Sequence, residues 1–214
     1  MQQTTPRRSN RERSEDTRDR LIRAARRLFV EKSYAETGTP EIVREAGVTR
    51  GALYHHFADK QALFAAVAER EAESVAREIE TGALDTTSAT AALIDGGAAY
   101  LKAMTHPGRT RLLLLDGPAV LGRRRMDEIE DRHGNRTLRE GLHAAMEAGA
   151  LRSLPLDALT GLLAAAFDRA ALAIDAGSDA VAQIAALNGL IEGLATAPAP
   201  APAPAPTPAP TRQV

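Results

Sequence analysis

The sequence predicts an all-α protein in which a small N-terminal unit of helices is joined to a larger helical body. Apolar residues make up 44% of the chain but aromatic residues only 3%, so the core must consist mainly of Ala, Leu, Ile and Val, a composition that favours helices. Apolar residues recur at three- and four-residue steps, and no segment shows strand-like alternation over a useful length. Five prolines fall between these periodic segments or just inside their starts: Pro6, Pro40, Pro107, Pro118 and Pro155.

The N-terminal part contains four predicted helices. The first covers residues 17–32, and the second covers residues 40–46, with Thr39 as its N-cap and Gly47 ending it. Thr49 caps a third helix that runs to residue 57, and Asp59 caps a fourth over residues 60–81. In the body we expect helices over residues 87–105, 109–115, 119–148 with a break near Gly134, 156–176 and 179–195.

Charge and composition divide the chain into four parts. Residues 1–60 hold 13 Lys/Arg against 9 Asp/Glu, a net +4, whereas the remainder holds 14 against 19, a net −5. A basic module on an acidic body is expected when only one part contacts phosphates. Seven prolines alternate with other residues from Pro198 to Pro210, which forbids a helix there. We therefore expect a disordered basic arm over 1–16, a head over 17–64, a body over 65–196 and a disordered Ala/Pro tail over 197–214.

Several classes of protein are excluded by what the sequence lacks. With no cysteine, the chain forms no disulfide, thiolate metal site or cysteine nucleophile. The charged N-terminus has no apolar stretch of a signal peptide behind it, and Asp168 and Arg169 interrupt the most apolar later stretch, 162–174. We expect a soluble cytoplasmic protein without metal or cofactor.

Residues 38–57 have the pattern of a helix-turn-helix. Ile42 and Ala46 lie on one side of the short second helix, and Gly47 supplies a turn in which a side chain would clash. Leu53 and Phe57 anchor the next helix to the same core. Two short helices held at a steep angle by a glycine turn are typical of a DNA-binding motif.

The helix after the turn leaves small and polar residues off the core. Thr49, Arg50 and Ala52 would face a major groove, and Gly51 and Ala52 permit close approach to DNA. The Tyr54 hydroxyl and the Lys60 ammonium have the chemistry of phosphate contacts. His55 and His56 diverge by about 100° on a helix, so each is either a contact or a solvated side chain.

The segment from Gly47 to Phe64 resembles the signature of the tetracycline-repressor (TetR) family, and Leu21 to Phe29 resembles its opening helix. The resemblance implies an all-α homodimer with a three-helix DNA-binding head and a body that holds an inducer pocket and the dimer interface. It makes Thr37 and Thr39 phosphate contacts; Thr49, Arg50 and Ala52 base-side residues; and Tyr54, His56 and Lys60 backbone contacts. Two departures from the pattern weaken the transfer near the second helix: Ser33 replaces a usual glycine, and Gly38-Thr39-Pro40 replaces a more usual polar start.

The predicted helices 156–176 and 179–195 each present one apolar face, with many small residues beside it. Such helices suit a four-helix interface between two subunits, or they pack within one chain. The family resemblance favours the dimer.

A ligand cavity in the body would be aliphatic, because only Tyr100 and Phe167 are aromatic after Phe64. Asp116, in a predicted buried helix ended by a turn, is its candidate polar group. The candidate lining residues are Tyr100, Met104, Leu113, Leu114, Asp116, Met126, His143, Met146 and Phe167.

The helix-turn-helix predicts a DNA-binding transcriptional regulator. The family resemblance implies a repressor that an unknown small molecule releases from a palindromic operator. Two alternatives remain. Glu140, His143 and Glu147 share a helical face that suits a metal or acid/base chemistry, but surface pairing explains them and no catalytic motif accompanies them. A helical adaptor would use its helix-turn-helix to bind protein, and its DNA binding would not depend steeply on salt.

Overall fold

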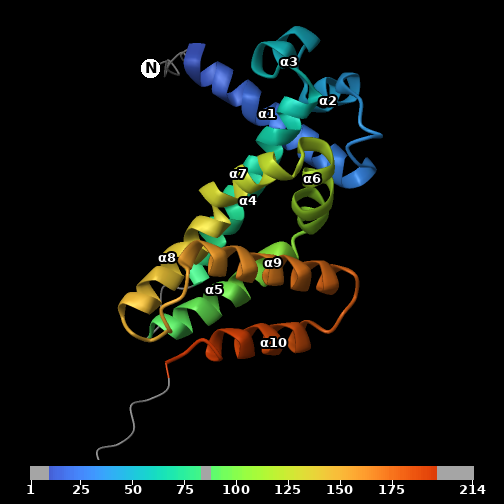
Figure 1. Cartoon of the computed structure of the whole chain (residues 1–214). Helices are drawn as coiled ribbons and strands as arrows, with labels where there is room; N and C mark the ends of the chain where they lie inside the picture. The colour runs from blue at the N-terminus through green and yellow to red at the C-terminus, as the bar shows by residue number, and fades with distance from the viewer. Residues whose placement is uncertain (1–9, 83–87, 197–214) are drawn as a thin grey trace, which may run out of the picture.

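The computed structural model describes residues 10–82 and 88–196, and this part of the chain confirms the predicted all-α class (Figure 1). Its helical elements run in chain order as α1 Asn10–Lys32, α2 Thr39–Ala46, α3 Arg50–His56, α4 Lys60–Gly82, α5 Ala89–Met104, η1 Arg111–Asp116, α6 Gly117–Leu121, α7 Arg123–Arg132, α8 Gly134–Glu147, α9 Leu156–Asp175 and α10 Ala180–Glu192. The predicted tail lies outside the described residues.

The head at one end of the molecule consists of α1, α2, α3 and the start of α4 (Figure 1). Leu21 and Phe29 of α1, Ile42 of α2, Leu53 of α3 and Phe64 of α4 are all fully buried in one cluster. Aromatic rings of Phe29, Phe64 and Tyr34 pack together there, with centroids 5.2–5.6 Å apart. The helix-turn-helix is therefore fixed to the rest of the protein by an apolar core.

The first helix begins earlier than the sequence predicts. We expected a disordered arm up to residue 16, but α1 starts at Asn10. This segment has no apolar stripe, and local polar contacts accompany the extra turns: Arg11 pairs with Glu15 at 3.0 Å, and the Thr17 hydroxyl donates to the Arg13 carbonyl at 2.9 Å. Apolar periodicity cannot detect such a helix end.

Helix α4 connects the head to the body. Its first turns bury Leu63 and Phe64 in the head core, and its later turns pack against α5 and α8. The long helices of the body, α5, α8 and α9, lie side by side at the end opposite the head, with α10 beneath them (Figure 1). A movement of α4 would therefore be felt by both parts.

The chain between α5 and α8 departs from prediction. Residues 111–116 form a π-helix, and Gly117 and Pro118 continue directly into α6 instead of making the predicted turn. The predicted helix over 119–148 is divided at Gly122, whose φ is 82° and which the sequence did not single out. The predicted break near Gly134 is confirmed, because α7 ends at Arg132 and α8 begins at Gly134. One π turn brings residues five apart together, so Arg111 Nε lies 3.1 Å from Asp116 Oδ2.

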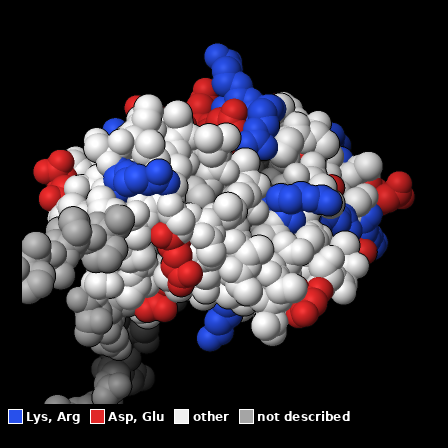
Figure 2. Space-filling model, turned by 60° about the horizontal axis from the view of Figure 1, so that its bottom comes forward, with Lys and Arg blue, Asp and Glu red and all other residues white. Residues whose placement is uncertain are grey.

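Helices α9 and α10 leave large apolar side chains uncovered at the far end of the body. Leu162 is 71% exposed, Val181 75% and Leu190 54%. Figure 2 shows this face, where uncharged atoms form a broad area interrupted by isolated charged side chains. No helix in the described ranges has the length and apolar character that crossing a membrane requires.

Candidate DNA-binding head and effector cavity

The turn of the helix-turn-helix has the geometry that its sequence demands. Gly47 has φ 62° and ψ 39°, a left-handed conformation that suits glycine. Arg20 of α1 donates from Nη2 to the carbonyls of Ala46 and Gly47 at 2.6 and 2.8 Å, and a Cβ at position 47 would lie only 2.8 Å from that nitrogen. The glycine therefore allows both the turn and the arginine that ties it to α1.

Helix α3 begins at the predicted cap. The Thr49 hydroxyl accepts a hydrogen bond from the Ala52 amide at 3.2 Å, which satisfies one of the free donors at the helix start. Leu53 is buried, whereas Thr49, Arg50, Gly51, Tyr54 and His55 are exposed. The side of α3 away from the core thus carries the predicted base-side residues.

Three predicted DNA contacts converge on this exposed side. The Arg50 guanidinium lies 5.5 Å from the centroid of the Tyr54 ring. Hydrogen bonding with Thr39 and with Arg50 lowers the pKa of the Tyr54 phenol. Thr39 stands at the start of α2, so the cluster joins the two helices of the motif with a hydroxyl, a phenol and a cation.

The two histidines differ in environment. His55 is exposed, whereas His56 is half-buried, and their rings meet edge to face with centroids 5.2 Å apart. Burial, followed by repulsion from His55 and Arg18, lowers the pKa of His56 below its ordinary value of 6.5. In the absence of DNA, the neutral form of His56 is therefore favoured at neutral pH.

Thr37 is a correction to the predicted set. It is only 1% exposed, and its hydroxyl donates to the carbonyls of Ser33 at 2.7 Å and Leu28 at 3.2 Å. The side chain closes the loop after α1 and has no path to a phosphate. A polar residue near the start of α2 looks the same in the sequence whether its hydroxyl faces solvent or the preceding helix.

Lys60 has an internal role that the sequence did not predict. Its Nζ donates to the carbonyls of Tyr34 and Thr37 at 2.9 and 3.0 Å and lies 4.1 Å from the centroid of the Tyr34 ring. Two donors of the ammonium therefore hold the α1–α2 loop. A phosphate contact by Lys60 stays a prediction.

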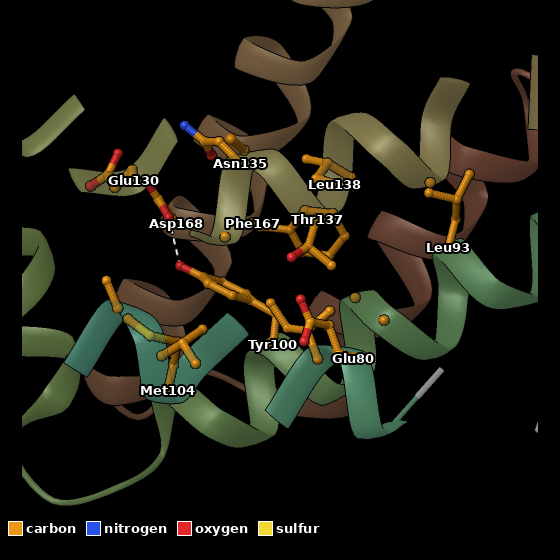
Figure 3. Close-up of a pocket in the computed structure, with 18 of the residues that line it drawn as sticks. Glu80, Leu93, Tyr100, Met104, Glu130, Asn135, Thr137, Leu138, Phe167 and Asp168 are labelled. Carbon is orange, nitrogen blue, oxygen red and sulfur yellow. Dashed lines mark hydrogen bonds between the residues drawn. The ribbon is translucent and has the colours of Figure 1, made fainter. Parts of the chain in front are cut away.

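The body contains a cavity of about 430 Å³ between α4, α5, η1, α7, α8 and α9. Five predicted residues line it: Tyr100, Met104, Leu113, Leu114 and Phe167. Tyr100 and Phe167 meet edge to face with centroids 5.9 Å apart (Figure 3). Most of the remaining wall is aliphatic, as the sequence predicts.

Four predicted lining residues lie elsewhere. Asp116 is paired with Arg111, and Met126 is fully buried beneath Gly117. His143 is exposed on α8, and Met146 is half-buried in the core packing. Helical spacing places residues on a face of their own helix but does not decide which face a distant helix covers, so these four predictions are wrong.

The polar groups of the cavity were missed as ligand contacts by sequence reasoning. Asp168 accepts a hydrogen bond from the Tyr100 hydroxyl at 2.6 Å, and Glu130 lies beside it (Figure 3). Burial raises the pKa of Asp168, and burial together with repulsion from Asp168 raises the pKa of Glu130 to about 7. An aspartate in the apolar stretch 162–174 was the available signal, but it was interpreted only as an interruption of a membrane span.

The enzyme alternative gains no support from the geometry. Glu140 pairs with Arg136 at 3.1 Å, and His143 and Glu147 are exposed beside it on α8. Within residues 10–82 and 88–196, no three His, Asp or Glu side chains are placed to hold a metal ion.

A network of charges centred on the buried Glu71 and Arg109 joins the head to the body. Glu71 of α4 binds Arg26 of α1 at 2.7 Å and Arg109, which precedes η1, at 3.1 Å. Arg109 also reaches Glu78 at 2.9 Å. A further arginine of this segment, Arg111, donates to the Phe29 carbonyl of α1 at 3.0 Å. The segment that carries cavity residues Leu113 and Leu114 is therefore attached to the head.

Known proteins share both the head and the body. The model for bacterial regulatory proteins of the tetR family matches residues 21–67, and the model for the tetracyclin repressor-like C-terminal domain matches residues 90–197. The A-factor receptor protein of Streptomyces griseus is 34% identical over 91 residues, which cover 42% of this chain and 31% of that protein. This relative and two further curated regulators are matched over only 29% to 52% of their lengths.

Solved structures extend the similarity to the whole fold. A TetR-family transcriptional regulator from Pectobacterium atrosepticum has a TM-score of 0.70 at 29% identity, with 89% of this chain and 100% of that chain covered. The regulator FadR from Bacillus subtilis, solved with stearoyl-CoA, shares the fold with a TM-score of 0.69 at 17% identity, covering 81% and 96%. The fold and the head are those of helix-turn-helix transcriptional regulators. The C-terminal model alone covers half of the chain, and the protein belongs to the TetR family.

Proposed function

We propose that this protein binds a palindromic DNA operator as a homodimer and is released from it by a small molecule bound in the body. The observation that carries the DNA-binding proposal is the cluster of exposed Arg50 and Tyr54 with half-buried Thr39 on a helix-turn-helix whose opposite side is buried. Thr49, Gly51 and Ala52 offer small groups where α3 would enter a major groove. Arg50 is the one side chain of the α3 start that can read guanine with two parallel hydrogen bonds.

The dimer proposal is supported by the outer faces of α9 and α10. Leu162, Val181 and Leu190 are more than half exposed on this face. A Cβ at Gly161 or Gly189 would meet no atom within 4 Å, so there is room for another helix to approach. Exposed apolar side chains beside small residues, on two adjacent helices, fit a four-helix contact with a second copy.

The response to a ligand would pass through elements shared by cavity and head. Helix α4 contributes Ala72, Val75 and Ile79 to the cavity wall, while Leu63 and Phe64 of the same helix are fixed in the head core. A ligand that shifts α4 would change the separation of the two α3 helices in a dimer. Since the heads must match half-sites about 34–36 Å or a multiple of that apart, a small shift weakens DNA binding.

Sequencing of DNA fragments selected by the purified protein tests this proposal. We expect a palindrome, and we expect Arg50→Ala to weaken binding to it by roughly tenfold to a hundredfold. Arg125→Ala is the matched control, because Arg125 is an exposed arginine of α7 that pairs with Glu128 and lies outside the head. Binding should also fall steeply with salt, by about 10³-fold between 50 and 200 mM for six phosphate contacts.

Recovery of no common site, or equal effects of Arg50→Ala and Arg125→Ala, would overturn the DNA-binding proposal. Weak dependence on salt would favour the helical adaptor, in which the same motif binds a protein.

A further inference from the structure

The charged side chains that line the cavity are all carboxylates. Among the described residues, the wall includes the four carboxyl groups of Glu80, Glu130, Glu140 and Asp168, and it includes no Lys, Arg or His. The rest is mostly aliphatic and aromatic, with Asn135 and Thr137 as neutral polar groups. An apolar chamber with only acidic charges favours a positively charged guest and disfavours an anionic one.

Two of these carboxyl groups share one neighbouring arginine. Arg136 lies 2.9 Å from Glu80 and 3.1 Å from Glu140, and all three side chains are about half exposed. They form an ion-paired edge of the cavity. This pairing and their exposure to solvent make them weaker determinants of ligand charge than Glu130 and Asp168.

Glu130 and Asp168 are compensated much less. The side chain of Glu130 is 19% exposed, and its nearest cation is Arg123 Nη2 at 3.7 Å. Arg123 is itself 64% exposed and makes a closer pair with Asp127, at 2.8 Å. Asp168 accepts the Tyr100 hydroxyl at 2.6 Å, a neutral donor (Figure 3). Two carboxyl groups thus lie at one end of an apolar cavity, and the one cation paired with either of them among the described residues is the largely exposed Arg123.

The pKa values of Glu130 and Asp168 reflect this shortage of positive charge. Burial and the Asp168 charge raise the pKa of Glu130 to about 7; Asp127 and Asp131 add to the rise, and Arg123 opposes it. Burial raises the pKa of Asp168 despite the Tyr100 hydrogen bond and Arg123. Tyr100 has a pKa well above its ordinary value, because of burial and Asp168, so it stays protonated and donates. A cation placed between the two carboxyl groups would relieve their repulsion and lower both pKa values.

We propose that the effector of this protein is an apolar amine, whose ammonium group binds between Glu130 and Asp168 while its hydrocarbon body fills the aliphatic part of the cavity. This inference rests on the proposed function, since it assigns a ligand class to the cavity of a ligand-released regulator. The ammonium would bring a positive charge, which the Tyr100 hydroxyl cannot supply, and further hydrogen-bond donors for both carboxylates. Leu93, Leu138 and Phe167 form apolar wall for the body of the ligand (Figure 3).

Three probes that share one hydrocarbon body separate the possible ligand chemistries: 4-phenylbutylamine, 4-phenylbutan-1-ol and 4-phenylbutanoate. Binding is measured by titration calorimetry on the full chain without DNA, so the result does not depend on whether DNA binding is correct. We expect the amine to bind at least about tenfold more tightly than the alcohol, and the carboxylate more weakly than either. At pH 7, where Glu130 is about half protonated, amine binding should release up to about half a proton, detected from buffers of different ionisation enthalpy.

The variants Glu130→Gln and Asp168→Asn keep the shape of each side chain, and asparagine still accepts from Tyr100. Each should remove most of the preference for the amine while changing alcohol binding by less than about twofold, and Glu130→Gln should abolish the proton release. Glu147→Gln, an exposed carboxylate of α8 outside the cavity wall, is the matched control and should change nothing.

The inference is overturned if the alcohol or the carboxylate binds as tightly as the amine, if none of the three binds, or if the amine preference survives in both variants. A separate titration of the selected operator tests release. If the amine binds as expected but leaves operator affinity unchanged, the ligand class stands and the ligand-release part of the proposed function fails.

Discussion

Replacement of Glu71 by glutamine should reveal how much the junction between head and body contributes to stability. The side chain of Glu71 is 8% exposed and that of Arg109 6%, with 3.1 Å between Oε2 and Nε. Glutamine has the same shape but no charge, so Arg109 would remain buried with less compensation. Removing one partner of a buried ion pair costs about 3–5 kcal/mol.

The expected loss is smaller than that, because Arg109 keeps other acceptors. Its Nη1 still reaches Glu78 at 2.9 Å and the Ala103 carbonyl at 2.7 Å. The Arg26 pair is partly exposed and should add less than about 1 kcal/mol. We therefore expect Glu71→Gln to lower the free energy of unfolding by about 2–3 kcal/mol.

Urea unfolding followed by circular dichroism, at one fixed protein concentration, measures this loss. Glu73→Gln is the matched control: Glu73 also pairs with an arginine on α4, Arg77, but both side chains are more than half exposed. Its effect should stay below about 0.5 kcal/mol. Equal effects of the two substitutions would refute the assignment of the junction to a buried charge network.

The lowered pKa of Glu71 predicts how the stability loss in Glu71→Gln depends on pH. Burial alone would raise the pKa of Glu71, but hydrogen bonds from Arg26 and Arg109 outweigh it, and the pKa lies below its ordinary value of 4.5. A carboxyl group with a lowered pKa in the folded state stabilises the fold above its ordinary pKa, and this contribution is lost as the pH falls through the folded value. The difference between the unmodified chain and Glu71→Gln should be full at pH 7 and should shrink below about pH 4. A difference that grew on acidification would contradict the assignment.

Three further substitutions test other features. Ser33→Gly should raise the free energy of unfolding by about 0.5 kcal/mol. Ser33 has φ 87°, and the strain of a residue with a side chain in this conformation is larger than the extra backbone entropy that glycine loses on folding. A lower free energy of unfolding in urea would contradict this prediction. Gly97→Ala should cost about 1–3 kcal/mol in the same assay, because the new Cβ would lie 2.6 Å from Phe167 Cζ, whereas Gly96→Ala, with 3.5 Å to its nearest atom, should cost nothing. Leu162→Glu should weaken self-association at least about tenfold in sedimentation experiments, and an unchanged dimer would exclude this face as the interface.

The helix-turn-helix is predictable because its determinants lie close together in the sequence. The turn glycine, the Thr49 cap and the core residues Ile42 and Leu53 fall within twelve residues, and the contacts of each with its neighbours follow from helical geometry. The burial of Thr37 could not be predicted in this way. Its burial depends on carbonyl groups of α1, and no local pattern reports which of them remain free.

The cavity is less predictable because its wall comes from six helical elements far apart in the sequence. Aromatic residues were good indicators, since Tyr100 and Phe167 had few alternatives in a body with no other aromatics after Phe64. Carboxyl groups were poor indicators of the cavity wall. Asp116 lies in an apolar run as Asp168 does, but a π turn gives Asp116 a partner, Arg111, while Asp168 faces the cavity.

The charge network constrains how a ligand in the cavity can act on the head. If α4 moved independently of the segment before η1, the pair between Glu71 and Arg109 would open together with the Glu78 pair, and the buried Arg109 would lose both of its carboxylate partners, at a cost of about 3–5 kcal/mol. A ligand typically supplies a coupling free energy of about 1–3 kcal/mol, which is too little to open that pair. We therefore expect α4, Arg109 and the π-helix to move together, with Arg26 carrying the displacement into α1 and so into the position of α3.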